Sequence, residues 1–298
     1  MPAKIEILSV DLLDEHRLLV NDLRSLANSL GLEFGWHYLL DLTWIISQLP
    51  FDSVKPPSLH ILDAGAGVGV MQWYLAERGA HVISVDRVER VNLSLRFRGR
   101  YHVGGLRPQD LNSIPKTIYR GVISREIPLK NVLSDLAYGM VGIFQQGVST
   151  IRGSVTIYHQ DLLTLTDIPG NTLDAVVSVS ALEHNSPEDL VLIVPELMRV
   201  LKPGGKLLTT LGAGKRDWFH QLSKGWCYTV ESLRRLFDLP RDTPDNYARY
   251  DELLTALCNC AELRDNLAGF YFCSGDNGMP WGKWGPQYQV VGVCKVKE

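Results

Sequence analysis

The stretch "LDAGAGVGV", residues 62–70, decides the fold expected of this chain. Three glycines, at positions 65, 67 and 69, follow the apolar run "LHILD" (59–63), which is typical of a short buried strand. Glycine allows a tight turn and lets the backbone approach a ligand closely. A glycine-rich turn between a strand and a helix therefore predicts a ligand site at the carboxyl end of that strand, for a dinucleotide, a phosphate or another adenosine ligand.

Alternating strands and helices are predicted around this turn. The stretch "MQWYLAERG" (71–79) is typical of a helix that ends at a glycine, and "HVISVD" (81–86) of a second strand, which together give a βαβ unit. Further strands are predicted at 154–161, 173–180, 206–211, 269–274 and 288–297, with helices at 187–201, 230–237 and 251–267. The pattern predicts an α/β fold: a doubly wound, mainly parallel, seven-stranded sheet whose last strand is antiparallel, because no helix separates the final two strands.

A proline-rich linker divides the chain near residue 50. Two apolar or amphipathic helices precede it, at 12–30 and 36–49, and predict an N-terminal helical cap over residues 1–50 that could act as a lid on the site. Residues 51–298 are expected to form the ligand-binding domain. A helical or irregular insert, residues 87–150, lengthens the connection between its second and third strands.

The composition narrows the class of protein. With 298 residues and a formal net charge of −3, the chain has no global basic field to attract nucleic acid or a membrane surface. Its five cysteines contain no CxxC pair, so no metal site is predicted, and an odd number of cysteines suits a reducing compartment. The first twenty residues resemble no signal peptide, and no apolar run reaches the roughly 18 residues that span a bilayer. A cytoplasmic protein is expected.

The glycine turn favours one class of adenosine ligand. Val70 stands where a dinucleotide fingerprint has its third glycine, and the lysine of a phosphate-binding loop is missing. The pattern that is present, D-x-G-x-G-x-G from Asp63 to Gly69, resembles the first motif of class I S-adenosylmethionine-dependent methyltransferases. The resemblance implies S-adenosyl-L-methionine as the cofactor.

Four further features follow in the order that this family shows. Asp86 ends the second strand, where a carboxylate accepts ribose hydroxyls, and an acidic position follows the third strand near the adenine. The stretches "SVSALEH" (178–184) and "LKPGGKL" (201–207) resemble the family's turns after the fourth strand and into the fifth. The resemblance thus implies a cofactor site made by Asp63, Gly65, Ala66, Gly67, Asp86, Arg87, Asp161, Leu162 and Ser178.

Candidates for catalysis and for acceptor binding come from loops on the same side of the sheet. His184 and His220 are candidate general bases. The family often carries a Glu-His pair without a catalytic task, so Glu183 and His184 could instead support the cofactor loop. Four tryptophans on long loops are predicted to wall the acceptor pocket, with the alternative that they pin those loops to the sheet: Trp218, Trp226, Trp281 and Trp284. His37 is expected to be a core or surface residue.

The insert is rich in arginine, which leaves two interpretations open. Its arginines are Arg87, Arg90, Arg96, Arg98, Arg100, Arg107, Arg120 and Arg125. They could form a solvated face, or they could bind an anionic group of the substrate, because arginine forks match phosphate and carboxylate. The predicted function is methyl transfer to a small or medium-sized metabolite, with or without such a group. The alternatives are an RNA methyltransferase, an aminopropyltransferase or a non-catalytic S-adenosylmethionine-binding partner subunit, and the oligomeric state is not predicted.

Overall fold

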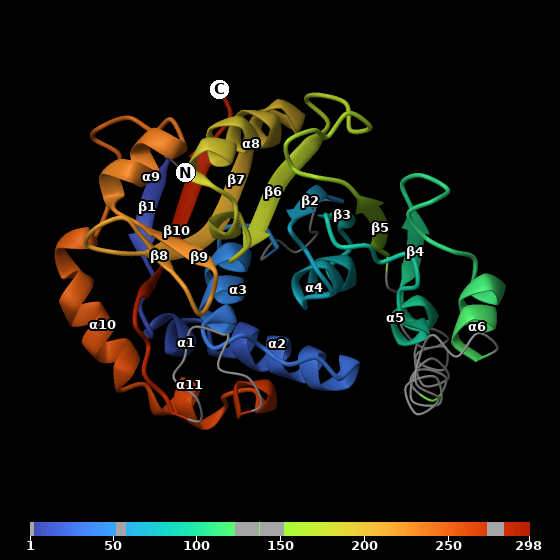
Figure 1. The fold of residues 1–298 in the computed structure, drawn as a ribbon, viewed down its shortest axis with the longest axis horizontal. Coiled ribbons are helices and arrows are strands. Elements are labelled where there is room, and N and C mark those ends of the chain that lie inside the picture. The colour runs from blue at the N-terminus through green and yellow to red at the C-terminus, as the bar shows by residue number, and fades with distance from the viewer. Residues whose placement is uncertain (1–2, 52–57, 123–136, 138–151, 273–282) are drawn as a thin grey trace.

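A computed structural model describes residues 3–51, 58–122, 137, 152–272 and 283–298 of the chain (Figure 1). Its sheet has ten strands where seven were expected, and eight of them follow one another in the order β1-β10-β7-β6-β2-β3-β5-β4. The strands are β1 (Lys4–Ile7), β2 (His60–Ala64), β3 (His81–Asp86), β4 (His102–Gly105), β5 (Ser154–His159), β6 (Leu173–Val179), β7 (Leu201–Ala213), β8 (Trp218–His220), β9 (Gly225–Tyr228) and β10 (Gln289–Val296).

The middle of the sheet is parallel, as predicted. Strand β2 pairs in parallel with β3 on one side and β6 on the other, and β5 and β7 continue the same direction. Asp63 lies beside Ser84 in β3 and Val177 in β6. The carboxyl ends of these strands therefore meet along one edge, where an open α/β sheet binds its ligand.

The closing strand β10 is antiparallel, as predicted, but its neighbours differ from those expected. It lies between β7 and the N-terminal strand β1, with Val293 facing Thr209 on one side and Ile5 on the other. The described part of the expected strand 269–274 is instead a 3₁₀ turn, η3 (Gly269–Phe272). Because β10 is buried over its first six residues, it needs a hydrogen-bonding strand on both sides. The alternating burial of β1 suits the edge position.

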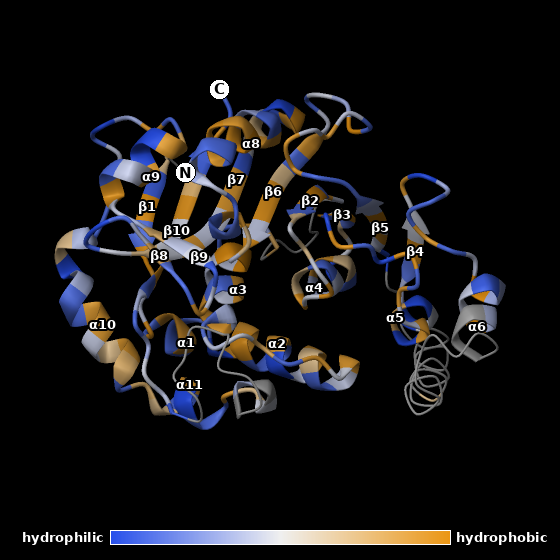
Figure 2. Cartoon of the chain, viewed as in Figure 1, coloured by the Kyte–Doolittle hydropathy of each residue, from blue (hydrophilic) through white to orange (hydrophobic). Residues whose placement is uncertain are grey.

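Helices cover both faces of the sheet (Figure 1), which confirms the doubly wound α/β fold. The α-helices are α1 (Leu12–Glu15), α2 (Arg17–Leu30), α3 (Tyr38–Ser47), α4 (Met71–Glu77), α5 (Leu95–Arg100), α6 (Ile114–Val122), α8 (Pro187–Val200), α9 (Val230–Leu236), α10 (Tyr250–Cys258) and α11 (Ala261–Asp265). Two more 3₁₀ turns are η1 (Leu182–His184) and η2 (Tyr247–Arg249). Ala175 and Val177 pack on the α2–α4 side and Val176 on the α8–α9 side. The hydrophobic colour accordingly concentrates on the central strands (Figure 2).

Three local predictions are refined by the structure. The helix expected at 12–30 is divided at His16 into α1 and α2, and it ends, as predicted, at Gly31 in a left-handed conformation. Ser186 caps α8 by accepting a hydrogen bond from the backbone N–H of Asp189, with Pro187 at the first helical position. The insert contributes a strand, β4, that extends the sheet by pairing in parallel with β5.

Across the described ranges, no helix is long and apolar enough to cross a membrane.

Candidate cofactor and acceptor site

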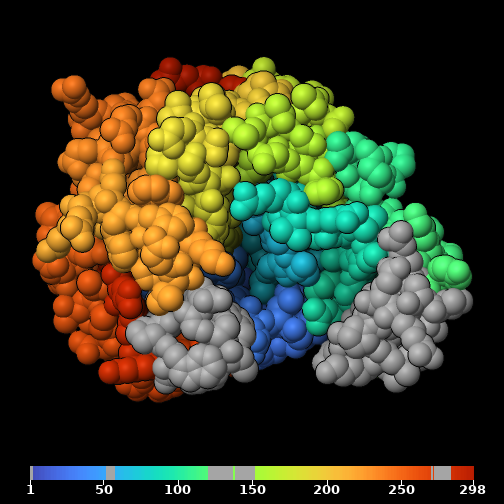
Figure 3. Space-filling view, viewed as in Figure 1, coloured from blue at the N-terminus to red at the C-terminus, as the bar shows by residue number. Residues whose placement is uncertain are grey.

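A cavity of about 410 Å³ lies at the carboxyl ends of β2, β3, β5 and β6, and Figure 3 shows the hollow between these segments and the N-terminal helices. The N-terminal segment closes one side of it through Glu33, Phe34, Tyr38 and Leu42. The strand ends supply the remaining lining: Asp63, Gly65, Ala66, Gly67, Val68, Gly69, Val70, Met71, Asp86, Arg87, Val88, Gln160, Asp161, Leu162, Val179, Ser180, Ala181, His184 and Asn185.

Eight of the nine residues expected to hold the cofactor line this cavity, and Ser178 does not. Ser178 is fully buried, and its hydroxyl donates a hydrogen bond to the carbonyl of Ala64 at 2.9 Å. That bond joins β6 to the end of β2 just beneath the glycine turn. The structure therefore places Ser178 as a support of the cavity wall.

The glycine turn, residues 65–69, has the backbone conformation that its sequence requires. Gly65 has φ +73°, and a Cβ built on it would lie 2.4 Å from the Cβ of Ala181. Gly67 has φ +49°, and its N–H donates to a carboxylate oxygen of Asp86 at 2.7 Å. The other oxygen of that carboxylate accepts the N–H of Val88 at 2.7 Å. These two bonds fix the Asp86 carboxylate at the cavity's edge.

Arg90 supports the glycine turn from behind, a role that the sequence did not predict. Its guanidinium donates to the carbonyl of Gly67 at 2.7 Å and to the hydroxyl and carbonyl of Ser84 at 2.6 and 2.7 Å. Gln72 donates to the same Gly67 carbonyl at 3.3 Å. Arg90 is 5% exposed, so it is unavailable to a substrate anion. No sequence signal distinguishes it from its arginine neighbours.

Asp63 is a buried carboxyl group inside the cavity wall. Burial raises its pKa to about 7, the nearby Arg90 opposes that rise, and Asp86 adds to it. A positively charged partner would stabilise the ionised form of this buried carboxyl group, because desolvation disfavours that form. The ammonium group of an amino-acid-bearing ligand would be such a partner.

A second, smaller cavity of about 90 Å³ adjoins the first and shares Tyr38, Ser180 and His184 with it. Its complete lining is Trp36, His37, Tyr38, Ser180, Glu183, His184, Ser223, Tyr271 and Tyr288. The sequence did not predict a role for His37 beyond the core or surface. Its ring Nδ1 lies 2.7 Å from a carboxylate oxygen of Asp41, one helical turn later, and both side chains are buried. The i, i+4 spacing of a histidine and an aspartate was the available signal.

The two candidate bases lie in different surroundings. His184 is exposed, lines both cavities and donates from Nδ1 to the carbonyl of Lys224 at 3.0 Å. His220 is 2% exposed and lines neither cavity. Its Nδ1 lies 2.8 Å from the hydroxyl of Ser223 and its Nε2 lies 3.0 Å from the amide oxygen of Gln287. His220 therefore sits behind the wall of the smaller cavity, with its ring 5.2 Å from that of Tyr288.

None of the three described tryptophans from the predicted set lines either cavity. Trp218 and Trp226 pack on opposite sides of the sheet, against its two hydrophobic cores. Trp284 donates its indole N–H to the carbonyl of Cys258 at 2.9 Å. Its ring centroid lies 6.1 Å from that of Trp36, which does line the smaller cavity. Trp281 lies outside the described residues. Trp218, Trp226 and Trp284 thus pack against the cores or a neighbouring loop, outside both cavities.

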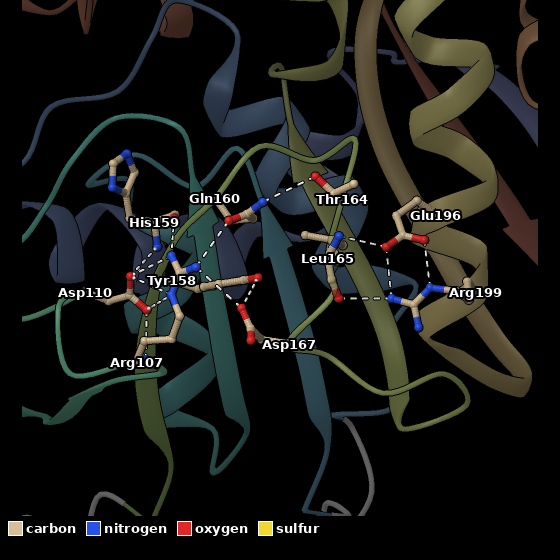
Figure 4. Close-up of polar contacts among 10 residues, drawn as sticks. All are labelled: Arg107, Asp110, Tyr158, His159, Gln160, Thr164, Leu165, Asp167, Glu196 and Arg199. Atoms are coloured by element: carbon tan, nitrogen blue, oxygen red, sulfur yellow. Dashed lines mark hydrogen bonds and ion pairs between the residues drawn. The ribbon is translucent and has the colours of Figure 1, made fainter.

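The insert arginines are mostly engaged within the protein. Arg107 forms an ion pair with Asp110 and reaches Asp167 at 3.5 Å (Figure 4). Arg100 pairs with Glu77 at 2.6 Å, and Arg98 donates to Thr117 at 3.2 Å. Arg87 is the described arginine that lines the larger cavity, and Arg120 and Arg125 have no described side chains.

The loop after β5 is held in place from the neighbouring helix. Glu196 of α8 accepts the N–H of Leu165 at 2.7 Å, and Arg199 donates to the Leu165 carbonyl at 3.0 Å (Figure 4). Within the loop, Asp161 accepts the N–H of Leu163 at 2.9 Å. This anchoring presents Asp161 and Leu162 to the cavity.

Among the described side chains, no group of histidine, cysteine and acidic residues could hold a metal ion.

Comparisons with known proteins agree with the expected chemistry. A family model described as a methyltransferase domain matches residues 121–205. No curated protein matches the sequence significantly.

Solved structures match at low identity. A Pyrococcus horikoshii protein shares 19% identity, with 52% of this chain and 46% of that chain covered and a TM-score of 0.29. The phosphoethanolamine N-methyltransferase 2 of Haemonchus contortus shares 16% identity, with 96% and 59% covered and a TM-score of 0.44. The [4+2]-cyclase SpnF shares 15% identity, with 99% and 98% covered and a TM-score of 0.48. The chain thus spans about half the length of the first two.

Replacing Gly65 by alanine tests the site. The added Cβ would meet Ala181 and force a left-handed alanine, so we expect the affinity for S-adenosylhomocysteine, measured by calorimetry, to fall at least about tenfold. Gly79→Ala is the matched control, because Gly79 is also left-handed, at φ +89°, but has no atom within 4 Å of its Cβ position. Equal affinity losses in both variants would show that backbone strain, and not the cavity, causes the effect.

Replacing Asp86 by asparagine tests the ribose contact. Asparagine keeps the shape but lacks the charge and one acceptor oxygen, so we expect a loss of about 1–3 kcal/mol in S-adenosylhomocysteine binding. Asp174→Asn is the control. Asp174 also accepts a backbone N–H, from His60 at 2.8 Å, but at the opposite edge of the sheet. Unchanged affinity in Asp86→Asn would contradict the assignment.

Proposed function

We propose that this chain is a class I S-adenosylmethionine-dependent methyltransferase and that it methylates a small or medium-sized metabolite whose acceptor atom enters the smaller cavity. The observation that carries the proposal is the shared wall. Tyr38, Ser180 and His184 line both cavities, so a group bound in one cavity lies next to a group bound in the other. Methyl transfer needs such direct contact.

The larger cavity fits the cofactor by the chemistry of its lining. We assign Asp63 and the glycine turn to the methionine end, Asp86 to the ribose hydroxyls, and Asp161 with Leu162 to the adenine, in line with the family resemblance. The absence of a Cβ at Gly65 supports this assignment, because any side chain there would fill the space between the turn and Ala181. When bound, S-adenosylmethionine supplies a methyl group already activated by a positively charged sulfur.

The protein's own task is to align the acceptor and exclude water. Tyr38 and Leu42 of α3 cover the larger cavity from the cap side, and Tyr38 also closes the smaller one. Placing the acceptor in line behind the methyl carbon provides most of the required rate enhancement, since the leaving group needs no further activation. His184 faces the shared wall and remains a candidate base. We assign His220 and the three described tryptophans of the predicted set to supporting the loops.

The small volume of the second cavity favours a metabolite over RNA. The arginines that could form a basic surface are paired with Asp110, Glu77 and other internal partners, which also weakens the case for an arginine-bound substrate anion. Arg87 is the remaining candidate for an anionic group. The four described cysteines are free, which supports a reducing compartment such as the cytoplasm.

Methyl transfer to a metabolite is the direct test. Incubating the protein with methyl-labelled S-adenosylmethionine and a fractionated cell extract should transfer label to small molecules, detected by mass spectrometry, and Gly65→Ala should abolish most of it. Label in the RNA fraction would favour the RNA alternative. Cofactor binding without transfer to any fraction would identify a non-catalytic partner subunit and contradict the proposal.

The raised pKa of Asp63 predicts opposite effects on stability and binding. Because its folded-state pKa rises from 3.8 to about 7, the protonated carboxyl contributes stability that is present below about pH 4 and lost as the pH rises toward 7. The asparagine in Asp63→Asn does not titrate. The free energy of unfolding of this variant, relative to that of the wild type, should therefore increase by about 1–3 kcal/mol between about pH 4 and pH 8.

Cofactor binding by the Asp63→Asn protein should be weaker and less dependent on pH, since the wild type needs an ionised carboxylate to pair with an ammonium group. Calorimetry over the same pH range, with S-adenosylhomocysteine, measures this. Parallel pH dependence in the two proteins would show that Asp63 is not the titrating group.

A further inference from the structure

The smaller cavity contains a carboxylate without a cationic partner. Glu183 is 5% exposed, and one of its oxygens accepts the hydroxyl hydrogen of Ser180 at 2.5 Å. Its other oxygen, Oε2, is buried and has no hydrogen-bond partner. No lysine or arginine is among the described residues that line this cavity.

A buried carboxylate of this kind destabilises the protein unless a ligand supplies the missing partner. Burial raises the pKa of Glu183, and neighbouring His184 and Ser180 only partly oppose the rise. An unpartnered buried oxygen destabilises the fold, and more so when the group is charged. A positively charged ligand group in the cavity would remove most of that cost.

The backbone beside Glu183 is also held in an unfavourable conformation. Ser180 has φ +46°, which is uncommon for a residue with a side chain. Its N–H donates to the hydroxyl of Thr210 at 3.1 Å, and its own hydroxyl donates to the Glu183 carboxylate. Strained residues of this kind concentrate at functional sites. The hydrogen bond from Ser180 holds the Glu183 carboxylate beside the wall that the two cavities share.

Aromatic rings form the rest of the enclosure. Trp36, Tyr38, Tyr271 and Tyr288 line the cavity, and the rings of Trp36 and Tyr288 stand edge to face at 5.4 Å. The hydroxyl of Tyr271 accepts the backbone N–H of Trp36 at 2.7 Å, which ties the C-terminal part of the wall to the N-terminal segment. Aromatic faces attract cations and repel carboxylates.

A histidine with a fixed tautomer completes the cavity. The Asp41 carboxylate accepts the hydrogen on Nδ1 of His37, and Asp41 is fully buried with no other hydrogen-bond partner in the described structure. This bond leaves Nε2 of the neutral ring without a hydrogen, able to accept a proton. His37 lines the cavity that also holds Glu183.

We propose that the acceptor is a small amine, held as an ammonium ion by Glu183 and the aromatic rings, and that His37 removes its proton. The proposal rests on the proposed function. An anion or a neutral alcohol would leave the Glu183 carboxylate without compensation, whereas an ammonium group matches both the charge and the rings.

The resulting step balances in charge and atoms. The ammonium group gives one proton to Nε2 of His37, and the imidazolium that forms is paired with Asp41. The free nitrogen lone pair then bonds to the methyl carbon while the carbon–sulfur bond breaks and leaves its electron pair on sulfur. The sulfur loses its positive charge and the methylated nitrogen gains one, so Glu183 faces a cation before and after transfer. His37 returns its proton to solvent when the product leaves.

Three probes of similar size and different charge test the acceptor class: propylammonium, propan-1-ol and propanoate. They are titrated by calorimetry into protein saturated with S-adenosylhomocysteine. We expect propylammonium to bind tightest and Glu183→Gln to weaken it at least about tenfold, about 1.4 kcal/mol, with no effect on propan-1-ol. Glu188→Gln, at an exposed acid in the first turn of α8, is the matched control and should change nothing.

The outcomes separate the two proposals. Failure of the wild type to bind S-adenosylhomocysteine would contradict the proposed function itself. If S-adenosylhomocysteine binds normally, either of two results would overturn the amine proposal alone. One is that propanoate or propan-1-ol binds as tightly as propylammonium or tighter. The other is that the propylammonium affinity is unchanged in Glu183→Gln. Glutamine retains the shape of glutamate and removes a buried charge, so this variant is expected to fold.

The role of His37 is tested separately from binding. His37→Asn should keep propylammonium affinity within about twofold. Its single-turnover methylation of propylamine, followed by mass spectrometry, should be at least about a hundredfold slower than that of the wild type. Asp41→Asn should cause a smaller loss, because it removes the orientation of the ring and leaves the base. Unchanged turnover in His37→Asn, or no methylation of propylamine by the wild type, would overturn this assignment.

Discussion

The close approach of Gly65 to Ala181 is the contact on which the site depends. A methyl group at position 65 would lie 2.4 Å from the Ala181 side chain, so the turn after β2 and the turn after β6 can meet only with glycine there. Their meeting forms the floor of the larger cavity and places residues 179–185 beside the glycine turn. Arg90 and Gln72, behind the turn, hold its carbonyls and keep it rigid. Position and rigidity thus come from buried groups that no ligand touches.

The second cavity follows from the same arrangement. Because β6 ends beside the glycine turn, its strained exit at Ser180 leads directly to Glu183 and to α3, which approaches from the cap. Two successive residues at the start of that helix then differ in position: His37, which caps the helix, lines the smaller cavity alone, whereas Tyr38 lines both. Two buried carboxylates, at Asp41 and Glu183, reduce stability, and a site that uses their charge explains why the fold keeps them.

The sheet is extended at both edges by segments from outside the βαβ repeats. Strand β1 covers β10 at one edge, and β4 from the insert covers β5 at the other. The second extension brings the insert's arginines next to acids of the same region, such as Asp110 and Asp167 (Figure 4), which uses their charge within the protein. The arginines that cluster in the sequence of the insert are therefore largely paired with acidic residues in the structure.

The sequence by itself predicted the parallel sheet, the glycine turn, the acids at or just after the carboxyl ends of β2, β3 and β5, and with them the cofactor class that we propose. These are local patterns: burial periodicity, a turn that requires glycine, and spacing along one chain segment. Only the tertiary structure decided which strands flank β10, that Ser178 and His220 line neither cavity, and that His37, Asp41 and Glu183 lie at or beside one cavity. Those residues are separated by about 140 positions and come from α3 and the turn after β6, and no local pattern carries the information that two such distant segments meet. Their contact depends on how the N-terminal helices pack across the finished sheet.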